Sequence, residues 1–155
     1  MQHSVFITGC ATGFGNRLAK RFLDEGHRVV ATDRVLGDWT DGLQADGDRL
    51  LAMACDVRDE DSVDRAISVA LDFAPIDTLV NNAGYAIFGT QEEVDTSAVQ
   101  ELFDVNVVGL ARVTRALLPA LRDQRGMVIQ LSSVCLLYTS PSPRDYAASR
   151  MPSSA

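Results

Sequence analysis

One short stretch sets the architecture of this chain: Thr8-Gly9-Cys10-Ala11-Thr12-Gly13-Phe14-Gly15. The apolar run before it, residues 4–8, predicts a short buried strand, and residues 14–25 after it have the spacing of an amphipathic helix. Glycines between a strand and a helix let the backbone turn tightly and approach a pyrophosphate, which rests on the positive N-terminus of the helix. The stretch therefore predicts a dinucleotide-binding turn.

The helix and the strand after this turn complete the first unit of the fold. The helix is expected to carry Phe14, Leu18, Phe22 and Leu23 on one face, and Gly26 is expected to end it as a glycine cap. Residues 28–32 are apolar and rich in β-branched side chains, which predicts a second strand. A strand before the glycines and a helix after them are the context that a dinucleotide turn requires.

An acidic residue, Asp33, stands at the end of the second predicted strand. A carboxylate at this point is placed to accept hydrogen bonds from the ribose hydroxyls of adenosine, and it repels a 2′-phosphate. Thr12, just before Gly13, brings no positive charge for such a phosphate, although Arg34 partly offsets the repulsion. We therefore expect NAD rather than NADP as the cofactor; the alternative is that Asp33 is only a solvated turn residue.

Strand and helix patterns alternate through the rest of the first 134 residues. Periodicity predicts strands at residues 50–55, 76–80 and 127–131, and helices at residues 59–73 and 96–122. Residues 35–49 contain three glycines and several aspartates, which predicts a loop with at most one short helix. Nearly continuous apolar strands that alternate with helices indicate a parallel sheet covered on both faces.

The composition is that of a globular domain, with 46% hydrophobic and 23% charged residues among 155. The net charge of −7 argues against a nucleic-acid partner. No apolar run reaches the roughly 18 residues of a membrane span, and the start does not resemble a signal peptide, so a cytoplasmic protein is expected. Cys10, Cys55 and Cys135 have no metal-ligand spacing and are expected to be reduced thiols. The isolated His3 and His27 are expected at the surface or at helix ends.

Further motifs follow the predicted strands in order. Asp56-Val57 comes after the third strand, Asn81-Asn82-Ala83-Gly84 after the fourth and Ser132-Ser133-Val134 after the fifth, and Asn106 lies in the long helix. Together with the glycine turn, this series over residues 4–134 resembles the short-chain dehydrogenase/reductase family. The resemblance implies a Rossmann-type α/β fold, a doubly wound parallel sheet in three layers (α/β/α), here truncated after the fifth strand.

The resemblance also implies which residues bind the cofactor. They are Thr8, Gly9, Gly13, Phe14, Gly15, Asp33, Arg34, Asp56, Val57, Asn82, Ala83 and Gly84. Among them, Asp56 and Val57 are expected to touch the adenine. Asn82, Ala83 and Gly84 are expected to line the cofactor and to brace the sheet.

The activity that the resemblance implies is hydride transfer between a nicotinamide and a small secondary alcohol or carbonyl substrate. In such enzymes a tyrosine is the acid/base, a lysine four residues later lowers the pKa of that tyrosine, a serine polarises the carbonyl and an asparagine supports a water-linked proton relay. Ser133 and Asn106 match the serine and the asparagine and are the expected catalytic residues. Oligomers are common in the family, so a homo-oligomeric parent protein is a further expectation.

The segment after Val134 has a different character. Tyr146 stands where the family's tyrosine would fall, but position 150 is an arginine and Pro152 would stop the helix that the family places there. Residues 135–155 also resemble a translated sequencing adapter. We therefore expect residues 1–134 to be an incomplete NAD(P)-binding domain and the rest to be a non-native tail. On this hypothesis the 155-residue chain is poorly soluble and inactive.

Two other classes of function compete with an enzyme. A non-catalytic dinucleotide sensor would keep the glycine turn and dispense with the tyrosine, but it has no need for both Ser133 and Asn106. A structural subunit that binds a flavin or another nucleotide is disfavoured by the order of the motifs. The authentic sequence beyond Val134 would discriminate, since a tyrosine with a lysine four residues later indicates an enzyme.

Overall fold

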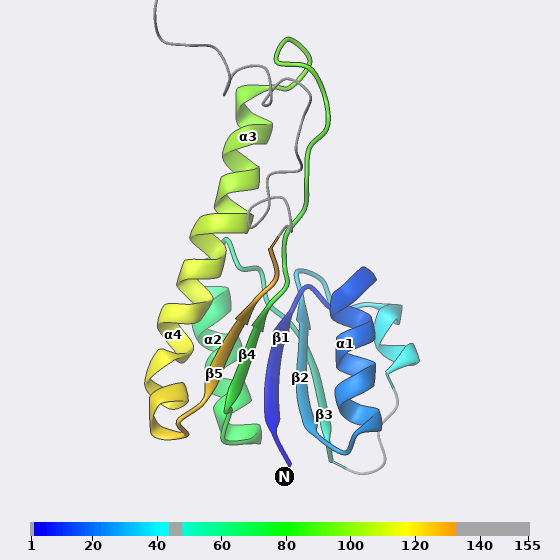
Figure 1. Cartoon of the computed structure of the whole chain (residues 1–155), viewed down its shortest axis with the longest axis vertical. Helices are drawn as coiled ribbons and strands as arrows, with labels where there is room; N and C mark the ends of the chain where they lie inside the picture. The colour runs from blue at the N-terminus through cyan, green and yellow to red at the C-terminus, as the bar shows by residue number, and fades with distance from the viewer. Residues whose placement is uncertain (1, 44–47, 133–155) are drawn as a thin grey trace, which may run out of the picture.

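A computed structural model of the chain describes residues 2–43 and 48–132 (Figure 1). Within these residues five strands form one parallel sheet: β1 Ser4–Thr8, β2 Arg28–Asp33, β3 Leu50–Ala54, β4 Thr78–Asn81 and β5 Met127–Gln130. The order across the sheet is β3-β2-β1-β4-β5. The chain therefore steps outward from β1 to β3 and then crosses back to β4, on the other side of β1.

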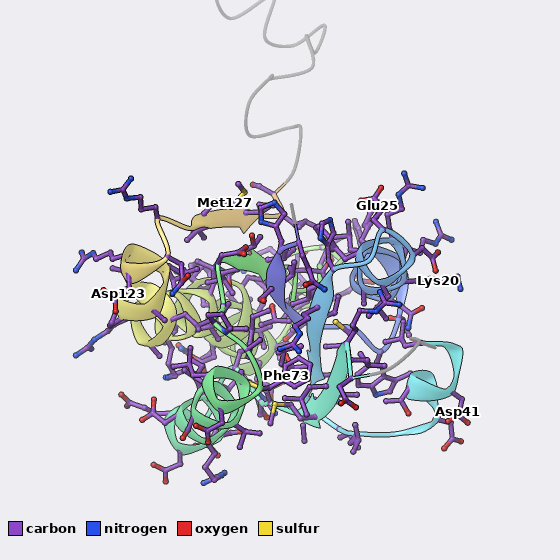
Figure 2. All side chains as sticks on the ribbon, turned by 90° about the horizontal axis from the view of Figure 1, so that it is seen from below. Lys20, Glu25, Asp41, Phe73, Asp123 and Met127 are labelled. Atoms are coloured by element: carbon purple, nitrogen blue, oxygen red, sulfur yellow. The ribbon has the colours of Figure 1, made fainter. Side chains whose placement is uncertain are left out.

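Helices cover both faces of this sheet. The helical elements are α1 Gly13–Asp24, the 3₁₀ helix η1 Asp38–Gly42, α2 Glu60–Phe73, α3 Thr96–Phe103, the π-helix η2 Asp104–Gly109 and α4 Leu110–Asp123. Figure 2 shows α1 against one face of the sheet and α2 and α4 against the other. The predicted three-layer, doubly wound α/β fold is thus confirmed.

The residues of β1 alternate between two separate cores. Phe6 joins the cluster formed with α2 and α4, whereas Val5 and Ile7 join Ala19 and Leu23 of α1. All of β1 is buried. This is the burial expected of a central parallel strand, which has a neighbour on each side and helices on each face.

The apolar face predicted for α1 is partly wrong. The buried residues of this helix are Gly15, Ala19 and Leu23, which recur every four positions, and Phe14 is 70% exposed. Each residue turns an α-helix by about 100°. Phe14 therefore points well away from the line of buried residues, and it lies in the first turn, beside the loop that joins β1 to α1.

Gly26 ends α1 as predicted. Its φ of +85° lies in the left-handed region, and its N–H donates to the carbonyl of Leu23 at 3.0 Å. The N–H of His27 donates to the carbonyl of Phe22 at 2.9 Å. This pair of bonds is the Schellman arrangement, which satisfies the last carbonyls of the helix.

His27 follows the end of α1, one of the places expected for it, and His3 and His27 contact each other although they are 24 residues apart in the chain. The backbone N–H of His3 donates to Nδ1 of His27 at 3.0 Å, and Nδ1 of His3 lies 3.1 Å from Oδ1 of Asp77. Each of these residues precedes a strand, so the contacts join the amino ends of β1, β2 and β4. The histidines lie at the amino ends of the strands, and the glycine turn lies at the carboxyl ends. Their positions fit a structural role.

The long helix predicted over residues 96–122 is continuous but not uniform. It runs from α3 through the π-helix η2 into α4, and in Figure 1 its first part projects beyond the ends of the strands. A π-helix closes each turn with one extra residue and is often found at functional sites. Asn106 lies in this segment.

β5 is the exposed strand of the sheet. Met127, Val128 and Ile129 are 53%, 37% and 39% exposed, and among the described residues β5 pairs with β4 alone. Figure 2 labels Met127 at this margin. Apolar side chains therefore lie partly exposed along β5 in the described part of the chain.

No helix among the described residues is long and apolar enough to cross a membrane. In the same ranges, no group of His, Cys, Asp and Glu side chains is arranged to hold a metal ion. Cys10 and Cys55 are buried free thiols, and burial raises their pKa values to about 12 and about 11. The raised pKa values keep both thiols protonated at neutral pH, and a protonated thiol is a poor nucleophile.

Candidate functional site

The candidate site lies where the strand order reverses, at the carboxyl ends of β1 and β4. In open α/β sheets a crevice forms at this point because the connections leave the two strands in opposite directions. Here β1 leads into the glycine turn and α1, and β4 leads into Asn82, Ala83 and Gly84. The sheet thus brings together the two motifs that the sequence places about 70 residues apart.

The hydroxyl of Thr8 ties these two strand ends together. Its Oγ1 accepts hydrogen bonds from the backbone N–H groups of Asn82 at 3.1 Å and Ala83 at 3.0 Å. In return, the Asn82 side-chain amide donates to the carbonyls of Thr8 at 2.9 Å and Gly9 at 2.8 Å. Thr8 and Asn82 therefore tie the carboxyl ends of β1 and β4 together, which is the bracing expected of Asn82.

Two glycines of the turn have different reasons to lack a side chain. A Cβ on Gly15 would collide with the carbonyl oxygen of Gly9. Gly13 has a φ of +63°, and among the described residues no heavy atom lies within 4 Å of the position its Cβ would take. Gly15 thus permits close packing of helix on turn, whereas Gly13 leaves open space in front of the helix.

The N-terminus of α1 has no side-chain cap among the described residues. Within the described ranges, the side chain of the N-cap residue Thr12 makes no capping hydrogen bond, and the first turn contains no acidic residue. The first N–H groups of a helix have no partner inside the helix, and the helix dipole adds a positive potential there. Open space at Gly13 and uncapped N–H groups behind it fit the pyrophosphate of a dinucleotide.

Asp33 lies beside this turn and is oriented by it. Its Oδ2 accepts from the backbone N–H of Ala11 at 2.8 Å, and its Oδ1 accepts from the backbone N–H of Arg34 at 2.7 Å. Each carboxylate oxygen can accept about two hydrogen bonds. One position on each oxygen is therefore left, which suits the two hydroxyls of a ribose.

Asp56 and Val57 follow β3 at the same edge of the sheet. Arg58 forms a bidentate ion pair with Asp56, and its hydrogen bonds hold the pKa of that carboxyl below the usual value. Val57 is buried, and its carbonyl accepts from Nη1 of Arg112 at 2.6 Å. The Val57 side chain thus belongs to the core, while Asp56 and Arg58 remain partly open to solvent.

Both polar atoms of the Asn106 side chain form hydrogen bonds with the backbone of Tyr85. Its Nδ2 donates to the carbonyl of Tyr85 at 2.7 Å, and its Oδ1 accepts from the N–H of Tyr85 at 3.1 Å. Gly84 is small enough to let Asn106 approach, because a Cβ there would lie 3.0 Å from Oδ1. Asn106 therefore fastens the long helix to the loop after β4.

The described residues include every predicted site residue except one. Ser133 lies outside them, as do Cys135, Tyr146 and Arg150 of the tail. Sequence reasoning missed two residues that the fold brings to the site, Arg58 and Tyr85. An arginine two positions after an aspartate is compatible with an Asx turn, but the pairing of Tyr85 with Asn106 has no signal in the local sequence.

Comparison with known proteins identifies this arrangement. The chain matches the family model described as short chain dehydrogenase over residues 3–152. It is 39% identical to the serine 3-dehydrogenase of Agrobacterium fabrum over 142 residues, which are 89% of this chain and 56% of that protein.

Solved structures of proteins from the same family resemble this chain. A short chain dehydrogenase/reductase from Burkholderia phymatum in complex with NAD has a TM-score of 0.80 and 29% identity, covering 96% of this chain and 55% of that one. The 3-ketoacyl-(acyl-carrier-protein) reductase from Brucella melitensis complexed with NADH has a TM-score of 0.79 and 32% identity, covering 94% and 63%. The chain thus spans about half to two thirds of the length of these relatives.

Proposed function

This chain belongs to the short-chain dehydrogenase/reductase family of oxidoreductases, and we propose that it is the NAD-binding part of an enzyme that oxidises a secondary alcohol or reduces the corresponding carbonyl. The observation that carries the proposal is the pairing of an uncapped helix N-terminus with Asp33. The open space at Gly13 accepts a pyrophosphate, and the Asp33 carboxylate, held by Ala11, accepts the ribose hydroxyls.

The preference for NAD over NADP rests on the charge of Asp33. A 2′-phosphate would be brought against a carboxylate whose orientation the N–H of Ala11 fixes. Arg34 is the nearest compensating charge in the sequence, but it also lies close enough to Asp56 to lower the pKa of that carboxyl. The positive charge of Arg34 therefore also acts on a carboxylate other than Asp33, which supports NAD.

We propose that the remaining site residues orient the parts of the site and polarise the substrate carbonyl. When bound, the nicotinamide supplies the hydride. Thr8 and Asn82 hold the carboxyl ends of β1 and β4 together, and Asn106 holds the loop after β4 in place. Ser133 is proposed to polarise the substrate carbonyl, on the strength of its match to the family's serine. The first substrates to test are small hydroxy acids, because the relative that shares 39% identity is a serine 3-dehydrogenase.

The tail is proposed to be non-native, so that Tyr146 and Arg150 are not the family's tyrosine and lysine. The family match extends into this segment, to residue 152, and the alternative is therefore a natural variant with an arginine at position 150. Sequencing the source DNA across codons 125–155 and beyond separates the two. A different coding sequence after Val134 supports the proposal, and a tyrosine with a lysine four residues later in it supports an enzyme over a sensor.

Direct binding tests the cofactor proposal on the chain as it is. NADH and NADPH are titrated into the 155-residue protein by calorimetry, in parallel and at the same salt concentration. We expect NADH to bind about tenfold more tightly, the effect of one unfavourable charge contact of about 1.4 kcal/mol. Equal affinities would refute the NAD preference, and the absence of binding by both would refute the dinucleotide site. No turnover is expected from the chain in its present form.

A further inference from the structure

The two histidines of the chain form a cluster at the amino ends of the strands. His3 lies just before β1 and His27 just before β2, and the centroids of their rings are 5.3 Å apart. Figure 2 looks onto this end of the molecule and labels Glu25, which follows α1. The glycine turn lies at the other ends of the strands, so this cluster is separate from the candidate site.

The hydrogen bond between the two histidines decides where a neutral His27 carries its proton. Nδ1 of His27 accepts from the backbone N–H of His3 at 3.0 Å. A ring nitrogen that accepts a hydrogen bond carries no proton, so the single proton of the neutral ring lies on Nε2. The side chain of His27 is 14% exposed, so water competes little with His3 for Nδ1.

The ring of His3 makes the opposite kind of contact. Its Nδ1 lies 3.1 Å from Oδ1 of Asp77. The Asp77 carboxylate also accepts from the backbone N–H of Ser4 at 3.1 Å and from the hydroxyl of Thr78 at 2.6 Å. An ionised carboxylate only accepts, so Nδ1 of His3 is the donor. His3 can therefore keep its contact when it is protonated, whereas His27 can accept from His3 only while it is neutral.

A carboxylate of α1 offers a protonated His27 a second partner. Oε2 of Glu25 lies 3.9 Å from Nε2 of His27, on the side of the ring away from Nδ1. The other oxygen of Glu25, Oε1, is paired with Nη2 of Arg21 at 2.7 Å. The ring of His27 thus lies between the N–H of His3, which needs an acceptor, and a carboxylate, which needs a donor.

Other charged groups lie on the elements around His27. Besides His3 and Asp77, they include Arg28 at the start of β2 and Arg49 before β3. Nη1 of Arg28 donates to the carbonyl of Phe73, and Nη1 of Arg49 donates to the carbonyl of Leu23. Because an arginine stays charged at every pH of interest, these two groups act on His27 equally before and after it is protonated.

We propose that His27 is a pH-sensitive latch, which holds the N–H of His3 while it is neutral and releases it for Glu25 when it is protonated. An imidazolium carries a proton on both nitrogens, so Nδ1 and the N–H of His3 would then be two donors facing each other. Histidine suits such a switch because its ordinary charge change falls between about pH 5 and pH 8. The released segment is the chain before β1, where the Gln2 side chain also donates to the carbonyl of Gly26 at 3.0 Å.

The test is an NMR titration of the full chain, whose two histidines give two sets of ring signals. We expect the nitrogen shifts of neutral His27 to show the proton on Nε2. As the pH falls, the amide signal of His3 should shift with the same midpoint as the ring of His27. Hydrogen exchange of that amide, corrected for the intrinsic rate, should become about tenfold faster, the effect of losing one hydrogen bond.

A matched pair of variants separates the two rings. In His27→Asn an amide oxygen can replace Nδ1 but cannot be protonated, so the step in the amide signal of His3 should disappear. In His3→Asn the amide of residue 3 should keep its step, because His27 still titrates. Glu25→Gln, which removes the negative charge beside Nε2, should move the step to lower pH.

Each result bears on the latch without involving the cofactor. A step that persists in His27→Asn, or that disappears in His3→Asn, would overturn the proposal. A neutral His27 with its proton on Nδ1 would overturn it as well, and this observation needs only the unmodified chain. It therefore decides the question even where a variant fails to fold.

Discussion

β1 and β5 are both short apolar strands of one parallel sheet, yet their side chains lie in opposite environments. In β1, Val5, Phe6 and Ile7 are completely buried, whereas in β5 Val128 and Ile129 are 37% and 39% exposed. The difference comes from their neighbours. β1 is paired on both sides and lies between α1 and the pair α2 and α4, while β5 is paired with β4 alone among the described residues.

The contrast teaches that an apolar run predicts a strand but not its burial. The free energy gained on folding follows the apolar area removed from water, about 25 cal/mol per Å². A residue of β1 contributes this gain in full, and a residue of β5 contributes only part of it. Four predictions follow from the contrast, in decreasing order of their effect on the free energy of unfolding.

A matched pair of isoleucines measures the contrast directly. Ile7→Ala should lower the free energy of unfolding by about 2–5 kcal/mol, because it leaves a cavity against α1. Ile129→Ala should lower it by about 1 kcal/mol or less, because the side chain is already 39% exposed. Urea denaturation followed by circular dichroism measures both. Similar losses from the two substitutions would mean that β5 is covered in solution.

The second prediction concerns the tie between β1 and β4. Thr8→Val keeps the shape of the side chain but leaves the N–H groups of Asn82 and Ala83 without their acceptor. We expect a loss of about 2–3 kcal/mol in the free energy of unfolding and weaker NADH binding. Thr8→Ser, which keeps the hydroxyl, should lose less than about 1 kcal/mol. Equal losses in the two variants would show that packing, and not the hydroxyl, holds the strand ends.

The third prediction is a pH dependence at the Asp56–Arg58 pair. Hydrogen bonds from Arg58 lower the pKa of Asp56 below its ordinary 3.8 in the folded chain. The pair therefore stabilises the fold above about pH 4, and its contribution is lost as the pH falls through the folded-state pKa. Both side chains are partly exposed, so we expect Arg58→Ala to cost under about 1 kcal/mol at pH 7.

Denaturation at pH 7 and below pH 3 provides the measurement. The difference between the unmodified chain and Arg58→Ala should shrink as the pH falls, because a growing fraction of the folded chains then has Asp56 protonated. A difference that persists at low pH would point to packing by the arginine side chain, and not to its charge.

The fourth prediction changes solubility with almost no change in stability. Ile129→Lys places a charge on the exposed β5, which blocks association through strand edges. We expect less self-association in light scattering and a free energy of unfolding within about 0.5 kcal/mol of the Ile129→Ala value. If the two variants associate equally, the exposed strand is not the surface through which the chain aggregates.

Much of the fold was predictable because its signals are local. The turn from Thr8 to Gly15, the acid at Asp33 and the cap at Gly26 each depend on backbone preferences over a few residues. The alternation of strands and helices depends on apolar periodicity over a single element. These features can be predicted from the sequence because the residues that form each of them are close together in the chain.

Other features were beyond prediction because they join residues that are far apart in the chain. Phe14 was predicted on the buried face of α1, but the line through Gly15, Ala19 and Leu23 faces the sheet. The amide of Asn106 meets the backbone of Tyr85, 21 residues earlier. No local pattern contains such a pairing, because it exists only once β4 and the long helix are packed together.

The chain sequence thus determined the type of each element and the chemistry of the glycine turn, through forces that act within one or two turns of backbone. The folded sheet determined the strand order, the burial of β1 against the exposure of β5, and the meeting of Thr8 with Asn82 across 74 residues. The physical reason is the separation along the chain of the residues that each interaction joins. Propensity and periodicity act along the chain, whereas hydrogen bonds between strand ends and the removal of apolar area from water depend on which segments become neighbours in space.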